Sequence, residues 1–167
     1  MKQEFSAKKT FTTDRLLIAP FTKGDFSFLQ KLWQEEFETN MAIAQNTFAL
    51  VEKRNQLGKG MFWLLKIKDS NMPIGTCELN NIDFENNCGE IGCTLKKEFR
   101  GLGYMKETLG CIINYAFWQL ALSYLEANID KKNCSSRRLF EKLGFVKNKE
   151  LYNIENRRNL FRFVLYR

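Results

Sequence analysis

The sequence predicts an α+β fold with the element order β-α-α-β-β-β-α-β-α-β-β. Three apolar, strand-like segments lie between residues 61 and 99 and are separated only by short turns, which is typical of an antiparallel meander. An amphipathic repeat then runs from Met105 to Leu120 and predicts a helix of about four turns. A further strand follows this repeat, so the helix forms a crossover after the fourth strand.

The first third of the chain predicts one strand and two helices. "FTTDRLLIAPF" is typical of a strand that ends at Pro20. Thr22 and Asp25 then stand at capping-box spacing, with Asp in place of the usual Glu, and apolar residues at helical spacing follow them. A second helix is expected over residues 46–57, ended by Gly58.

The middle and the end of the chain supply the remaining elements. The meander strands are "MFWLLKIKD", "IGTCELNNIDF" and "CGEIGCTLKKEF", divided by the turns "SNMP" and "ENN". After the long helix, "SYLEANID" predicts a strand and "SSRRLFEKLG" a short helix that stops at Gly144. "FVKNKELY" and "RRNLFRFVLYR" predict a closing hairpin around "NIEN".

Length and charge limit the possible functions. A chain of 167 residues is enough for one domain, expected over residues 1–167 with its core at about 11–167. No stretch approaches the ~20 apolar residues of a membrane span, and the polar N-terminus is unlike a signal peptide, so we expect a cytoplasmic protein without membrane contact. The net charge of +7 favours an anionic partner such as a polyphosphate cofactor, nucleic acid or an acidic surface.

Cysteine and histidine usage narrows the chemistry. There are five cysteines, no C-x-x-C and no histidine, so we expect reduced thiols and no metal site. The missing histidine excludes Ser-His and Cys-His catalytic pairs. Proton transfers would therefore be carried out by Glu, Asp, Tyr, Ser, Cys or water.

The turn "FRGLGYMKE" is the first candidate site. It lacks the third glycine of G-x-G-x-x-G, because Lys106 stands there, and neither glycine begins a P-loop. It fits Arg/Gln-x-x-Gly-x-Gly/Ala through Arg100 and Gly103, with Met105 at the last position. Residues 101–105 would present consecutive N–H groups at a helix N-terminus, where the helix dipole favours an anion. Met105 is in register with the apolar repeat, so we expect its side chain to face the core.

The chain resembles the GCN5-related N-acetyltransferase superfamily, and within it the ribosomal-protein N-terminal acetyltransferase type. Four segments carry the resemblance over most of the chain: "DRLLIAPF", "IGTCELNNIDFENNCGEIGCTL", "FRGLGYMKETLGCIINYAF" and "NCSSRRLFEKLGF". The resemblance implies a mixed, mostly antiparallel sheet flanked by helices, and acetyl-CoA as co-substrate. The cofactor-binding residues it implies are Cys93, Thr94, Leu95, Arg100, Gly101, Leu102, Gly103, Tyr104, Met105, Asn133, Ser136 and Arg138.

The same resemblance implies the catalytic residues. Glu90, on the strand before the turn, would accept the proton directly or through water, and Glu78 is the second candidate. Ser136 would protonate the departing thiolate. Cys134 could suggest a thiol nucleophile, but no histidine activates it and the family transfers the acetyl group directly. Arg137 and Arg138 lie in a helix first turn, where cations are disfavoured, so either they approach the cofactor's phosphates or they are a solvated pair.

The amine acceptor stays open between several classes. A protein α-amine has a pKa of about 7.7–8.0 against about 10.4 for a lysine, so it needs less help from a base. This favours a protein N-terminus, and the net charge of +7 suits a protein that visits ribosomes, because ribosomal RNA attracts it. A polyamine or aminoglycoside is the alternative, and the acidic run "WQEEFE" could receive it. A non-catalytic acetyl-CoA sensor and a nucleic-acid-binding protein are the other hypotheses, although we expect no stable nucleic-acid binding. We expect a monomer or a homodimer.

Overall fold

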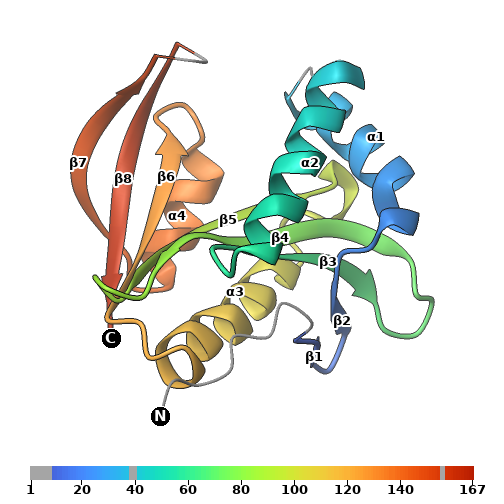
Figure 1. The fold of residues 1–167 in the computed structure, drawn as a ribbon, viewed down its shortest axis with the longest axis horizontal. Coiled ribbons are helices and arrows are strands. Elements are labelled where there is room, and N and C mark those ends of the chain that lie inside the picture. The colour runs from blue at the N-terminus through green and yellow to red at the C-terminus, as the bar shows by residue number, and fades with distance from the viewer. Residues whose placement is uncertain (1–8, 38–40, 155–156) are drawn as a thin grey trace.

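The computed structural model describes residues 9–37, 41–154 and 157–167, with side chains from residue 45 onward in the second range. Its strands form one eight-stranded sheet in the order β1-β2-β3-β4-β5-β6-β8-β7 (Figure 1). The strands are β1 Phe11–Thr12, β2 Leu16–Pro20, β3 Met61–Ile67, β4 Pro73–Asp83, β5 Cys88–Leu95, β6 Tyr124–Asp130, β7 Val146–Asn153 and β8 Arg158–Tyr166. The α-helices are α1 Phe26–Phe37, α2 Met41–Gln56, α3 Tyr104–Asn114 and α4 Cys134–Lys142, and a π-helical segment, Tyr115–Gln119, continues α3.

The predicted α+β class and its mixed, mostly antiparallel sheet are confirmed. β3, β4 and β5 form the antiparallel meander, and β7 and β8 form the closing hairpin. The β5–β6 pair is the parallel one, because α3 carries the chain back across the sheet between these two strands. Asp25 accepts hydrogen bonds from the backbone N–H of Thr22 at 3.0 Å and from its hydroxyl at 2.7 Å, as the capping-box spacing indicated.

Two predicted boundaries were wrong. The segment expected as one strand up to Pro20 is a hairpin of β1 and β2, with a turn at residues 13–15. Thr13 makes this turn, because its hydroxyl accepts a bond from the N–H of Leu16 at 2.9 Å while its own N–H donates to the Leu16 carbonyl. The second helix begins at Met41 rather than at residue 46.

The two faces of the sheet are covered by different helices. Alternate residues of β3 point to opposite faces. Trp63 belongs to the main apolar cluster, which includes residues of α3 and α4, whereas Phe62 packs with Leu29 of α1 and Val51 of α2. In Figure 1, α1 and α2 lie over the β2–β4 end of the sheet, and the β7–β8 hairpin stands at the other end.

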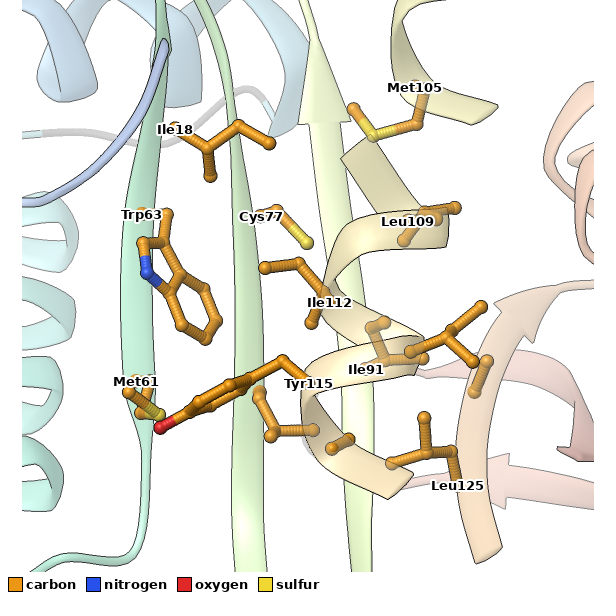
Figure 2. Packing of buried hydrophobic residues seen from close by; sticks show 14 of the residues in the cluster. Ile18, Met61, Trp63, Cys77, Ile91, Met105, Leu109, Ile112, Tyr115 and Leu125 are labelled. Atoms are coloured by element: carbon orange, nitrogen blue, oxygen red, sulfur yellow. The ribbon is translucent and has the colours of Figure 1, made fainter. Parts of the chain in front are cut away.

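Met105 faces the core, as its register predicted. Its side chain is only 8% exposed and belongs to the main cluster. Figure 2 shows Met105, Leu109 and Ile112 along one side of α3, directed at the sheet residues Ile18 and Cys77. The helix therefore presents its apolar side to the sheet, and its N-terminus lies at the glycine turn.

Candidate functional site

The site is centred on a split between two parallel strands. β5 and β6 pair through Cys88↔Tyr124, Gly89↔Leu125 and Glu90↔Glu126. Both strands continue beyond this point, β5 to Leu95 and β6 to Asp130, but the pairing between them ends, and Figure 1 shows them diverging. The backbone edge of Cys93, Thr94 and Leu95 therefore faces the split, while their other edge pairs with β4.

The glycine turn lies at the end of β5, before α3. Gly101 and Gly103 both have positive φ, +77° and +85°, which only glycine adopts readily. A Cβ at Gly101 would have no atom within 4 Å, so the turn is open on that side. Gly103 is the N-cap residue of α3, and no side chain in the described part of the protein caps the helix. The first N–H groups of α3 are thus left for a ligand, as an anion site requires.

Arg15, which sequence reasoning missed, holds this turn in place. Its Nη1 donates to the Leu102 carbonyl at 2.9 Å, and its Nε and Nη2 lie 2.8 and 2.7 Å from Glu107 Oε2. Its guanidinium also stacks 4.4 Å from the centre of the Tyr104 ring. Leu102 is 87 positions along the chain from Arg15, so no local pattern indicates this contact.

Arg100 has a structural use in the turn. Its Nε donates to the Leu95 carbonyl at 3.0 Å, and its Nη2 pairs with Glu36 of α1. Of the acidic run expected to receive a cationic acceptor, Glu36 is therefore engaged by Arg100 and Trp33 is buried. Glu38 lies outside the described residues. Glu35 of the same run is exposed, so its suggested role as an acidic surface for a cationic acceptor stays a prediction.

Asn133 and Ser136 meet at the start of α4, on the β6 side of the split. Asn133 is the N-cap, and its Oδ1 accepts a bond from the Ser136 N–H at 3.0 Å. This capping use leaves the amide N–H₂ of Asn133 and the hydroxyl of Ser136 as further donors. The predicted pair is therefore brought together, with Asn133 exposed and Ser136 partly buried.

The cations and thiols near the site have different environments. Arg137 Nη2 lies 3.1 Å from Cys134 Sγ, and this contact together with the arginine charge lowers the pKa of the exposed Cys134 thiol. The Arg137 guanidinium also lies 5.6 Å from the Phe161 ring, so Arg137 is not simply solvated. Arg138 is exposed. Burial, with a contribution from the Glu78 charge, raises the pKa of Cys93 to about 12, so its thiol stays protonated.

Both candidate bases lie on the α1–α2 face of the sheet, beside the split. Phe62 pairs with Glu78, and Glu90 pairs with Asn80 and Glu126, so these side chains share one face. Glu90 accepts a bond from Asn81 Nδ2 at 3.0 Å on one oxygen and from Asn128 Nδ2 at 3.0 Å on the other. Asn81 and Asn128 were missed, although the alternating polar residues of "YLEANID" did indicate a polar face.

Glu78 occupies the space that a glycine leaves on the neighbouring strand. It pairs with Gly92, and a Cβ at Gly92 would lie 2.5 Å from Glu78 Oε1 and 3.0 Å from its Cγ. The carboxylate therefore lies over β5 just past the last β5–β6 pair. Burial raises the pKa of Glu78, and the nearby charge of Glu90 adds to this. A base with a raised pKa is better matched to neutral pH.

The described residues contain neither a cluster of metal-ligating side chains nor a membrane-spanning helix. No group of three or more His, Cys, Asp or Glu residues there could hold a metal ion. None of the helices in that same part of the protein has the length and apolarity needed to span a membrane.

Comparison with known proteins gives a consistent family assignment. Residues 15–146 match the family described as Acetyltransferase (GNAT) domain. The uncharacterized N-acetyltransferase YjdG of Bacillus subtilis (strain 168) is 31% identical over 145 residues, covering 82% of this chain and 84% of YjdG. The uncharacterized N-acetyltransferase p20 of Bacillus licheniformis is 27% identical over 148 residues, 83% of each protein.

Solved structures share the fold. A Vibrio cholerae protein provisionally named a ribosomal-protein-serine acetyltransferase superimposes with a TM-score of 0.83 at 16% identity, over 97% of this chain and 99% of its own. A chimera of the Vibrio cholerae spermidine N-acetyltransferase SpeG and hSSAT superimposes with a TM-score of 0.79 at 19% identity, over 92% and 96% of the two chains. At these identities the likeness concerns the fold.

Proposed function

Because the chain belongs to the GNAT acetyltransferase family and is an N-acetyltransferase, we propose that it acetylates a primary amine with acetyl-CoA, and that this amine is a protein N-terminal α-amine. The observation that carries the proposal is the split after Glu90↔Glu126, which has an uncapped helix N-terminus at one end and an anchored carboxylate beside it. An anionic, elongated thioester substrate and an amine both find matching groups there.

The residues fit acetyl-CoA at three points. The positive-φ glycines and the free N–H groups of α3 would hold the pyrophosphate. The free edge of β5 at Cys93–Leu95 and the amide of Asn133 would hydrogen-bond the pantetheine arm. Acetyl-CoA supplies the activated acetyl group, and a β5 N–H would stabilise the negative charge that develops on its carbonyl oxygen.

Glu90 is proposed to take the proton of the attacking amine, directly or through a water. Ser136 would give a proton to the sulfur of the departing coenzyme A, so that one proton is removed and one is supplied in each cycle. An α-amine, with a pKa of about 7.7–8.0, is already partly neutral near pH 7.5. A lysine-like amine would need roughly 4 kcal/mol more for deprotonation. In a chain without histidine, this difference favours the α-amine.

Two relatives support different acceptors by their names. The ribosomal-protein-serine acetyltransferase name agrees with the α-amine, whereas the spermidine N-acetyltransferase name supports a polyamine as the second candidate. The carboxylates of Glu78 and Glu90 on one face would suit either cation. A direct comparison of an α-amine and a polyamine in one assay therefore decides which of them is the acceptor.

The test is release of coenzyme A thiol from acetyl-CoA with matched acceptors. A peptide with a free N-terminus is compared with the same peptide acetylated at its N-terminus, with spermidine and with an aminoglycoside. We expect thiol release with the free peptide and none with the blocked one. A kcat/KM for spermidine tenfold above that for every peptide would replace the α-amine by a polyamine.

Glu90→Gln and Glu78→Gln identify the base in the same assay. Glu90→Gln should lower kcat by about 10²-fold, the lower end of general-base contributions, with little change in acetyl-CoA affinity. If Glu90→Gln keeps kcat within twofold of the parent while Glu78→Gln loses it, the proton goes to Glu78. The control is Asp83→Asn, which removes the charge of another carboxylate at the end of β4, the strand that carries Glu78.

A further inference from the structure

We propose that Asn128 is a positioning residue for the acetyl transfer and that Arg162 fixes the orientation of its amide. This inference rests on the proposed role of Glu90. Asn128 lies on β6 two residues beyond Glu126, so it points to the same face but stands past the last backbone pair between β5 and β6.

A side-chain bond replaces the missing backbone pairing at this point. Asn128 Nδ2 donates to Glu90 Oε1 at 3.0 Å, across the split. Asn81 Nδ2 donates to Glu90 Oε2 at 3.0 Å from the β4 side. The two donors hold the carboxylate from opposite sides and fix its plane. Each oxygen keeps a further acceptor position, because a carboxylate has about four lone-pair sites. The two bonds thus fix the position of the Glu90 carboxylate and leave acceptor sites free for the amine or a water.

The amide of Asn128 can point in only one direction. Arg162, its register partner on β8, donates from Nε to Asn128 Oδ1 at 3.3 Å. A guanidinium has only donors, so the amide oxygen must face it and the N–H₂ must face Glu90. The reversed amide would set N–H against N–H and oxygen against carboxylate.

Arg162 is itself anchored on the sheet. Its Nη1 lies 3.1 Å from both carboxylate oxygens of Glu126. Arg162 therefore donates to Glu126 on one side and to Asn128 on the other, and Asn128 donates in turn to Glu90, so the four side chains are connected by hydrogen bonds. These hydrogen bonds link three strands, β5, β6 and β8, at the point where β5 and β6 separate.

The consequence is a specific kinetic signature. A base that is misplaced by about 1 Å can lose about 10²-fold in rate. The affinity for acetyl-CoA is proposed to depend on the glycine turn and on Asn133. None of the hydrogen bonds among Glu126, Arg162, Asn128 and Glu90 involves these groups. Loss of Asn128 should therefore lower kcat and leave the Kd for acetyl-CoA unchanged.

Asn128→Asp is the main variant, because it keeps the shape and replaces the donor by an acceptor that repels Glu90. We expect kcat to fall about tenfold or more, with the Kd for acetyl-CoA within twofold. Asn159→Asp, an exposed residue on β8, makes the same change of charge and should keep kcat within twofold. Arg162→Lys retains a charged donor, so it should keep more of kcat than Arg162→Met. Asn128→Ala replaces the Asp variant if the latter does not fold.

A double-mutant cycle distinguishes positioning from a separate role. If Asn128 acts through Glu90, the Glu90→Gln/Asn128→Ala double variant has the kcat of Glu90→Gln alone. If the fold-decreases in kcat of the two single variants multiply in the double variant, the inference is wrong. It is also wrong if the Asn128→Asp protein keeps the kcat of the parent. When Glu90→Gln lowers kcat and Asn128→Asp does not, the inference fails and the proposed function stands. If the Glu90→Gln protein keeps the full kcat, both the proposed role of Glu90 as the base and the proposed role of Asn128 in positioning it are wrong.

Discussion

Met105 belongs to the glycine turn proposed to hold the cofactor and also packs in the core. Met105→Ala tests which of these two uses its side chain serves. The family pattern prefers a small residue at this position, yet Met105 is only 8% exposed and packs in the main apolar cluster (Figure 2). Burial of such a side chain is worth about 1.5–3 kcal/mol, and truncation to Ala in a core typically costs about 2–5 kcal/mol once the cavity is included. Ala gains a few tenths of a kcal/mol in helix propensity. We therefore expect the free energy of unfolding to fall by about 2–3 kcal/mol.

The measurement pairs urea unfolding with calorimetric binding of acetyl-CoA. With an m-value of about 2 kcal/mol/M, this loss moves the unfolding midpoint by about 1 M urea. The Kd for acetyl-CoA should stay within threefold, because the side chain points away from the turn. Lys106→Ala, at the exposed neighbouring position, should change stability by less than about 0.5 kcal/mol. A Met105→Ala protein as stable as the parent, or one with a tenfold change in Kd, would refute the reasoning.

Three further predictions concern the same region. Gly103→Ala places a Cβ at φ +85° and 3.3 Å from Arg15 Nη2, so the Kd for acetyl-CoA, measured by calorimetry, should rise about fivefold or more; an unchanged Kd would mean that this turn does not hold the cofactor. Arg15→Gln removes the bond to the Leu102 carbonyl and the ion pair with Glu107. Because the Arg15 side chain is 45% exposed, the loss of stability should be about 1 kcal/mol or less, whereas the Kd for acetyl-CoA should rise about threefold. Glu78→Gln should stabilise the protein near pH 7, because burial raises the pKa of Glu78 above its usual 4.5 and its ionisation then opposes folding. The gain should appear as the pH rises through about 4.5 and vanish below it; denaturant titrations at several pH values that show destabilisation at pH 7 would contradict this.

Most of the fold was predictable because its signals are local. The meander between residues 61 and 99, the crossover helix and the closing hairpin each follow from periodicity and turn residues, and the structure confirms them. The hairpin within residues 11–20 was missed because its turn contains neither Gly nor Pro. Thr13 forms it with hydrogen bonds to Leu16, which a strand-like pattern of side chains does not reveal.

The candidate site was predictable only where one segment carries it. The glycine turn and the Asn133–Ser136 pair each lie within a few residues, so their motifs are visible in the sequence. The contacts that hold them are made between distant segments. Arg15 meets Leu102 only after the sheet forms, and Asn128 meets Glu90 across strands that α3 separates. Polar residues on a strand indicate which face is polar, but they do not indicate which partner each will find.

The distribution of charge along the chain agrees with a reaction between partners of opposite charge. Residues 130–167 contain 11 of the 26 Lys and Arg residues and 4 of the 19 Asp and Glu residues, so the first 129 residues are balanced with 15 of each. The basic segment begins at the end of β6 and includes α4, on the side of the split where Asn133 and Ser136 lie. The carboxylates of Glu78 and Glu90 lie on the opposite, α1–α2 face. The cations of α4, which packs on the α3 side of the sheet, would thus draw phosphates there, and Glu78 and Glu90 would draw a cationic amine to the other face, which is the separation that acetyl transfer from coenzyme A to an amine needs.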